Sequence, residues 1–196
     1  MTLGLGDLAN SIFASLGASG LTNPLNLPDA NRVALLLVDG MGNDVIEKYG
    51  AQFPILASLK IPQVLNSTFP STTATALATL GTGVLPGIHG MLGYTIRVPR
   101  SGEPGRLLNA LKWDERVDPL MWQSQPTLYE RAIADGIKSS YIAAKRYDGT
   151  GFTRATLRGS EYFGANRTDE MITYAKSALS SPKSFAYLYV NNLDHA

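Results

Sequence analysis

The chain has 196 residues, of which 44% are hydrophobic, so it is long enough to bury one substantial core and too short to predict two domains. Its 17 basic and 16 acidic residues nearly cancel and form no long block of like charge, which excludes an electrostatic case for nucleic-acid or membrane binding. Because cysteine is absent, disulfides, thiolate nucleophiles and zinc fingers are excluded, and a metal ion would need Asp, Glu, His or hydroxyl ligands.

The first 20 residues lack the basic start of a secretory signal, and Asp7 and Asn10 interrupt their apolar stretch. No part of the sequence approaches the roughly 20 consecutive apolar residues of a membrane-spanning helix. We therefore expect a soluble, cytoplasmic protein without a membrane partner.

The first half of the chain predicts alternating strands and helices. The apolar run from Val33 to Val38 stops at Asp39-Gly40, which is typical of a buried strand that carries an acidic side chain at its carboxyl end. Two short helices and a second strand are predicted next, at 44–49, 52–59 and 63–66. The Ala- and Leu-rich segment from Thr73 to Gly81 then predicts a compact buried helix.

Residues 97–125 carry prolines, glycines and both tryptophans without clear periodicity, which predicts an excursion or cap between core elements. Regular structure then resumes with predicted helices at 127–135 and 168–179 and predicted strands at 140–144 and 184–190. This alternation predicts an α/β fold with a largely parallel central sheet and helices on both faces. The last strand leads to Asp194 and the chain stops soon after, so we expect residues 1–196 to be the N-terminal part of one domain.

Two aspartates, Asp39 and Asp194, each follow a predicted strand, and the carboxyl ends of parallel strands meet at one edge of a sheet. Two carboxylates at one edge suit divalent cations. Taken singly, each aspartate is better explained as the cap of a turn or helix, and it is their matching placement that favours a shared site.

Thr72 and Thr73 lie at the predicted start of the 73–81 helix, where unpaired backbone N–H groups and the helix dipole would stabilise a bound phosphate. A hydroxyl there could attack phosphorus, although Thr is also a common structural N-cap. No G-x-S-x-G pattern supplies a base for it, so activation by a metal ion is the better candidate.

Three segments carry a resemblance to a known family: VALLLVDGMG, STFPSTTATALATLGTGVLPGIHGMLGY and AYLYVNNLDHA. In this order they resemble the type I phosphodiesterase/nucleotide pyrophosphatase family of the alkaline phosphatase superfamily, from Val33 to Ala196. The resemblance implies an alkaline phosphatase-like catalytic domain that is incomplete in this chain.

The resemblance also implies roles for individual residues. Asp39 corresponds to a zinc ligand, and the match of Phe69-Pro70-Ser71-Thr72-Thr73 identifies Thr73 as the nucleophile and a metal ligand rather than Thr72. Asp194 corresponds to a ligand of the second zinc ion. Tyr94 stands near the place of a phosphate-binding Asn of many family members, so it would contact the substrate instead, which puts a diester preference in doubt. His89, in the segment from Pro86 to Gly90, matches a His-Gly turn of the family, which implies a packing or turn residue rather than a metal ligand.

The implied activity is the hydrolysis of phosphodiester or pyrophosphate bonds through a covalent phospho-threonine, with two divalent metal ions, zinc by resemblance. A phosphomonoesterase, a phosphonate hydrolase or a phosphomutase of the same superfamily remains an alternative, as does a non-catalytic phosphate- or nucleotide-binding module. Because further ligands would lie beyond Ala196, we expect the 196-residue chain alone to be inactive.

Overall fold

A four-stranded parallel sheet forms the centre of the computed structural model, which describes residues 2–58, 63–102 and 104–193. Its strands lie in the order β1-β6-β4-β5, with bounds Arg32–Val38 (β1), Ser184–Val190 (β6), Lys138–Ala143 (β4) and Glu161–Gly164 (β5). The prediction of a largely parallel α/β sheet is therefore confirmed.

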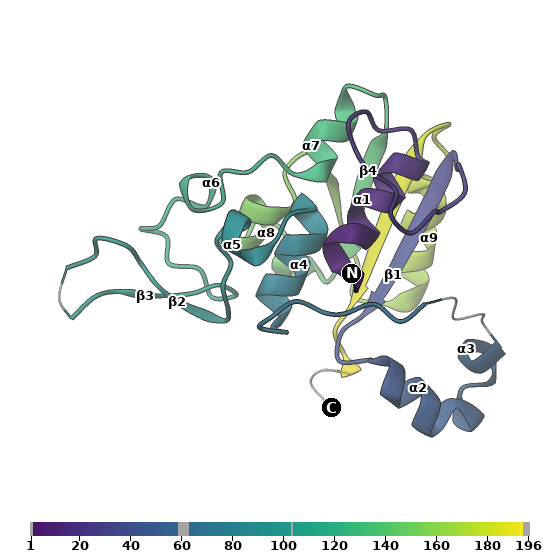
Figure 1. Ribbon diagram of the computed structural model, residues 1–196, viewed down its shortest axis with the longest axis horizontal. Coiled ribbons are helices and arrows are strands. Elements are labelled where there is room, and N and C mark those ends of the chain that lie inside the picture. The colour runs from purple at the N-terminus through teal and green to yellow at the C-terminus, as the bar shows by residue number, and fades with distance from the viewer. Residues whose placement is uncertain (1, 59–62, 103, 194–196) are drawn as a thin grey trace.

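Helices cover both faces of this sheet (Figure 1). Four of them share the larger hydrophobic core with the sheet: α1 (Leu5–Ser15), α4 (Thr73–Thr82), α7 (Leu128–Ile133) and α8 (Gly151–Thr156). The long helix α9 (Thr168–Ala178) packs on the opposite face, over β4 and β6, around Ile142 and Ala186.

The remaining elements are short. They are α2 (Asn43–Tyr49), η1 (Gly50–Gln52), α3 (Pro54–Ser58), α5 (Pro86–His89), α6 (Pro119–Trp122), η2 (Lys145–Tyr147) and the antiparallel pair β2 (Thr95–Arg97) and β3 (Leu107–Asn109). The β2–β3 hairpin extends away from the sheet (Figure 1). It occupies the segment for which the sequence predicts an excursion, and a role as a cap stays a prediction.

Two sequence predictions about strands are wrong. Residues 63–66 form no strand, because their only ladder contact in the described chain is an isolated bridge between Gly4 and Asn66. Strand β1 is not buried: in the described part of the chain it pairs only with β6, and Leu36 keeps 58% of its surface exposed. Helix α9 covers β6 and β4 and leaves this face of β1 open.

Helix α4 is buried along most of its length, as predicted, and it approaches α8 closely. A Cβ atom at Gly81 would lie 2.3 Å from the carbonyl oxygen of Thr156, so only glycine allows the two backbones to touch there. The helix ends at Gly83, whose φ of 72° is the left-handed conformation that commonly terminates helices.

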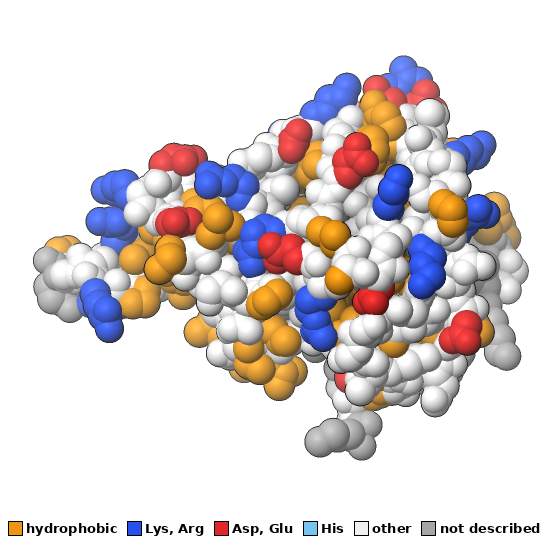
Figure 2. Space-filling view, turned by 90° about the horizontal axis from the view of Figure 1, so that it is seen from above, with side chains coloured by type: hydrophobic (Ala, Val, Ile, Leu, Met, Phe, Trp, Pro, Cys, Tyr) orange, Lys and Arg blue, Asp and Glu red, His pale blue; other side chains and the backbone are white. Residues whose placement is uncertain are grey.

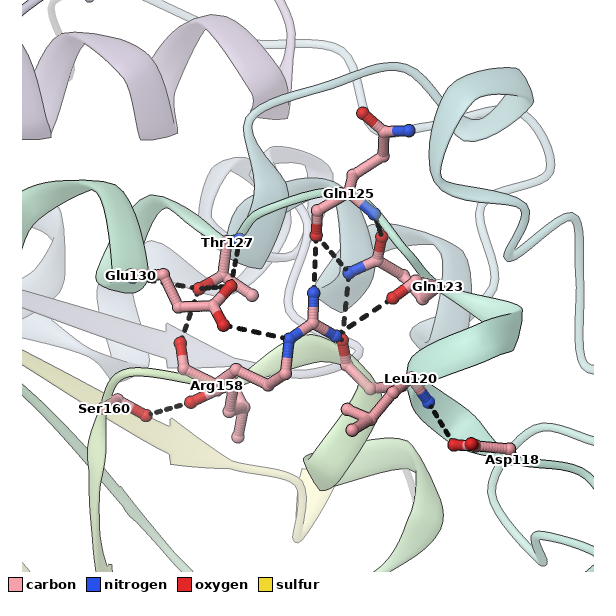
Figure 3. Close-up of polar contacts among 10 residues, drawn as sticks. Asp118, Leu120, Gln123, Gln125, Thr127, Glu130, Arg158 and Ser160 are labelled. Carbon is pink, nitrogen blue, oxygen red and sulfur yellow. Dashed lines mark hydrogen bonds and ion pairs between the residues drawn. The ribbon is translucent and has the colours of Figure 1, made fainter.

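Arg158 ties the connection between α6 and α7 to the end of α8 and to Glu130 in the first turn of α7 (Figure 3). Its guanidinium donates to the carbonyl oxygens of Gln123, Gln125 and Ala155 at 3.0, 2.6 and 2.8 Å and to Glu130 Oε1 at 3.2 Å. Glu130 in turn accepts from the backbone N–H of Thr127, the N-cap of α7. This network fixes residues 123–125, which have no regular structure of their own, against the two helices.

On the face drawn in Figure 2, basic and acidic side chains are intermixed, as expected from a formal net charge of +1. Among the helices of the described residues, none is both long and apolar enough to cross a lipid bilayer.

Candidate active site

Asp39 leaves the carboxyl end of β1 in a fixed position. The parallel register pairs Val38 with Val190, and the Asp39 backbone N–H extends the pairing by donating to the Val190 carbonyl at 2.7 Å. Gly40 follows with a φ of 77°, and its N–H donates to Asp39 Oδ1 at 3.0 Å. These two hydrogen bonds hold the half-buried Asp39 at the carboxyl end of β1.

Thr73 is the first residue of α4, and its hydroxyl donates to Asp39 Oδ2 at 3.2 Å. The neighbouring Thr72 hydroxyl pairs with Thr75 Oγ1 at 2.9 Å and makes no side-chain cap of the helix. The structure thus brings together two residues that stand 34 positions apart in the sequence. It also places the Thr73 hydroxyl at a helix N-terminus, where the dipole favours a negative charge.

A cavity of about 300 Å³ opens beside Thr73. Six of its lining side chains are aromatic and one of these is Tyr94, so the structure brings two residues singled out in the sequence to one cavity. The side chains of Lys112 and Arg146 also line it, and within the described residues no carboxylate does. The cavity can therefore hold an organic group next to the hydroxyl, and its charged lining is cationic.

Tyr189 makes a contact with Asp39 that sequence reasoning missed. Its phenol donates to Asp39 Oδ2 at 2.6 Å, the same oxygen that accepts from Thr73. The signal available in the sequence is the alternation Phe185, Tyr187, Tyr189 along β6, which places three aromatic rings on one face of the sheet, in one core cluster.

The aromatic wall is further ordered around Tyr147. Arg146 donates to the Tyr147 hydroxyl at 2.7 Å and lies 4.7 Å from the centre of its ring, and Asn191 donates to the same hydroxyl at 2.5 Å. Burial raises the pKa of Tyr141 and of Tyr187 well above the usual value, so these phenols stay protonated at neutral pH.

His89 lies outside this cavity and is the buried last residue of α5. The Met91 N–H donates to its Nδ1 at 3.1 Å, and its Nε2 lies 2.9 Å from Thr79 Oγ1. The first contact lies in the turn after α5, and the second joins α5 to α4.

The described residues contain no group of three or more His, Asp or Glu side chains that could hold a metal ion. Asp194, the second predicted ligand, lies outside the described residues. The donor chemistry of Asp39 and Thr73 nevertheless fits a divalent cation, because a carboxylate and a hydroxyl 3.2 Å apart offer hard oxygen ligands on one side of the sheet edge. These two residues fit as one part of a metal site.

A family model described as type I phosphodiesterase / nucleotide pyrophosphatase matches residues 33–196. The match includes Asp39, Thr73, Tyr94 and Tyr189. No curated protein matches the chain at a significant level. Enzymes of this family hydrolyse phosphoester bonds and are in general metal-dependent, which agrees with the oxygen donors at the sheet edge.

Proposed function

Because the chain belongs to the type I phosphodiesterase/nucleotide pyrophosphatase family, we propose that it cleaves phosphodiester or pyrophosphate bonds with Thr73 as the nucleophile. The observation that carries the proposal is the hydrogen bond from Thr73 Oγ1 to Asp39 Oδ2 at the N-terminus of α4, beside the cavity. Family membership supplies the class of reaction, and this contact supports the assignment of the residue.

In the proposed first step, Thr73 Oγ forms a bond to phosphorus while the bond from phosphorus to the leaving oxygen breaks. The threonine proton passes to solvent, and the leaving oxygen takes up a proton from solvent as it departs. In the second step water attacks the phospho-threonine, which releases the phosphoryl product and restores the hydroxyl. Asp39 holds the Thr73 hydroxyl oriented before the first step.

Asp39 and Thr73, with Asp194 as a further proposed ligand, would hold part of a two-zinc site whose ions lower the pKa of the hydroxyl and neutralise phosphoryl charge. The N-terminus of α4 adds N–H groups and a favourable dipole for the phosphoryl oxygens. The Tyr94 phenol is the proposed donor to the substrate, and the cavity would hold one organic substituent.

Replacing Thr73 with Ala in the full-length protein tests the nucleophile. We expect kcat for an aryl phosphodiester to fall by more than about a thousandfold, because a nucleophile is lost. The matched control is Thr72→Ala, one residue earlier, whose hydroxyl contacts Thr75 rather than Asp39 and whose loss should change kcat less than about threefold. Substantial hydrolysis by Thr73→Ala, or a Thr72→Ala variant that is the inactive one, contradicts the assignment.

Comparing an aryl phosphodiester with the matching monoester tests the substrate class. A higher kcat/KM for the diester supports the proposal, because the cavity offers room for an organic substituent beside Thr73. A higher value for the monoester favours a phosphatase instead. Binding of a nucleotide without metal ions and without turnover would favour the non-catalytic module.

A further inference from the structure

Tyr189 stands at the end of a row of aromatic side chains. Along β6, Phe185, Tyr187 and Tyr189 point to the same face, and Tyr189 comes last, one residue before the strand ends. Since β1 and β6 are parallel and in register, the end of β6 lies beside the point where Asp39 leaves β1. The Tyr189 phenol therefore lies beside the Asp39 carboxylate at the carboxyl end of the two strands.

The carboxylate of Asp39 is held from three directions. Oδ1 accepts from the Gly40 N–H, while Oδ2 accepts from Thr73 at 3.2 Å and from the Tyr189 phenol at 2.6 Å. An O–H donor this close to a carboxylate oxygen is in the range of strong, charge-assisted hydrogen bonds. Of the two side-chain donors, Tyr189 lies closer.

The ring of Tyr189 is itself fixed. The side chain is 7% exposed, and its ring lies 6.4 Å from the rings of both Tyr141 and Tyr147. A rigid donor loses little conformational freedom when it holds its acceptor. Not every buried tyrosine hydroxyl of this core has a hydrogen-bond partner, because those of Tyr129 and Tyr187 have none among the described residues.

We propose that Tyr189 is a positioning residue that orients the Asp39 carboxylate toward Thr73 and toward a divalent cation. The inference rests on the proposed function for the role of Asp39, and it assigns Tyr189 no contact with the reacting phosphorus. By donating to Oδ2 beside Thr73, the phenol limits rotation of the carboxylate, and with the Gly40 N–H on Oδ1 one lone pair of Oδ1 is left for a cation. A hydrogen bond of this kind to a metal ligand typically changes metal affinity or activity by about 10- to 100-fold.

The test is Tyr189→Phe in the full-length protein, which keeps the ring and removes only the donor. Two readouts are measured: the affinity of the metal-free protein for Zn²⁺ by calorimetric titration, and kcat and KM for an aryl phosphodiester. We expect the Zn²⁺ affinity to fall about tenfold or more and kcat to fall about tenfold or more, with KM within about threefold of its original value. The KM should hold because Tyr189 is assigned no bond to the substrate.

The matched control is Tyr129→Phe, which removes a buried phenol hydroxyl that has no partner among the described residues and lies outside the cavity. It should leave Zn²⁺ affinity and kcat unchanged. A purely structural role for Tyr189 predicts a lower Tm with unchanged Zn²⁺ affinity and unchanged kcat, and that result overturns the proposal.

The two hypotheses fail separately. If Thr73→Ala is inactive and Tyr189→Phe behaves like the original protein in both readouts, the positioning role is wrong and the proposed function stands. If Thr73→Ala remains active, the proposed function fails, and the calorimetric titration still decides whether Tyr189 supports a metal ligand.

Discussion

At the scale of single residues, the ionisation of His89 follows from its two ring contacts. Because the Met91 N–H donates to Nδ1, that nitrogen is an acceptor, and Nε2 carries the hydrogen that is donated to Thr79. The side chain is 1% exposed, and burial lowers its pKa from 6.5 to about 4. The imidazole is therefore neutral at pH 7 and ties the turn after α5 to α4.

We predict that acidification from about pH 6.5 to pH 4 destabilises the fold through His89. In this window the unfolded chain binds a proton at His89 and the folded chain does not, so the free energy of unfolding falls with falling pH. The loss is at most about 1.4 kcal/mol per pH unit. Urea unfolding of the original protein and of His89→Gln, at about pH 7 and about pH 5, measures it.

At the higher pH, His89→Gln should have a lower free energy of unfolding than the original protein, because it loses the ring contacts. This difference between the two proteins should become smaller at the lower pH. His195 is present in both proteins, so its titration cancels in the comparison. If the difference in free energy of unfolding between the two proteins is the same at both pH values, His89 is not buried as a neutral ring.

At the scale of elements, the contact of α4 with α8 is a backbone contact. We predict that Gly81→Ala lowers the free energy of unfolding by about 1–3 kcal/mol, because the added methyl group would overlap the Thr156 carbonyl. Alanine is the better helix former by about 1 kcal/mol, so helix propensity alone predicts the opposite sign. Denaturant unfolding of both proteins decides between the two effects.

Gly87→Ala is the control for this substitution. A Cβ atom at Gly87 would meet nothing within 4 Å, so the change should be neutral or slightly stabilising. If Gly81→Ala is as well tolerated as Gly87→Ala, the close approach of the two helices is not a constraint on the sequence.

The elements that could be predicted from the sequence are those with strong periodicity. Strands 32–38 and 184–190 and helix 168–178 agree within one residue, because long apolar or amphipathic runs fix their type. Helix α1, helix α8 and strand β5 were missed, since each is short or mixed in composition and is stabilised by tertiary contacts. Helix α1, for example, packs on α4, and its Asn10 side chain donates to the Gly83 carbonyl at 2.7 Å.

For the candidate site, sequence motifs were enough to bring Asp39 and Thr73 into one hypothesis, and the structure places them in contact. The Tyr189 phenol could not be predicted in the same way, because its reach depends on the register of β1 against β6. Likewise, Arg146 and Tyr147 join the cavity only through the path of η2 after β4.

At the scale of the whole molecule, one face of the sheet is incompletely covered. Leu36 on β1 is 58% exposed and Ile172 on α9 is 48% exposed, and both line one groove together with Leu188. Exposed apolar surface of this kind favours association. The strand β1 also presents an edge without a second neighbour in the described chain, which adds to the tendency.

We predict that the 196-residue chain self-associates as its concentration rises and that Leu36→Lys weakens this association about tenfold, the effect of one buried leucine. Sedimentation velocity over a concentration series measures it. Ile133→Lys is the control, because Ile133 is 60% exposed but belongs to α7 on the other face of the sheet. Equal effects of the two variants would show that the groove has no special part in association.

The contact of α4 with α8 at Gly81 also determines how the cavity can change during evolution. Residues of both helices line the cavity, Thr73 and Leu77 from α4 and Phe152 and Thr153 from α8, and the spacing of these helices is set where their main chains touch. Side-chain replacement cannot bring the two helices closer. New substrate preferences in this lineage should therefore arise in the connecting segments that carry Tyr94, Lys112 and Arg146, while the distance between the two helices is inherited unchanged.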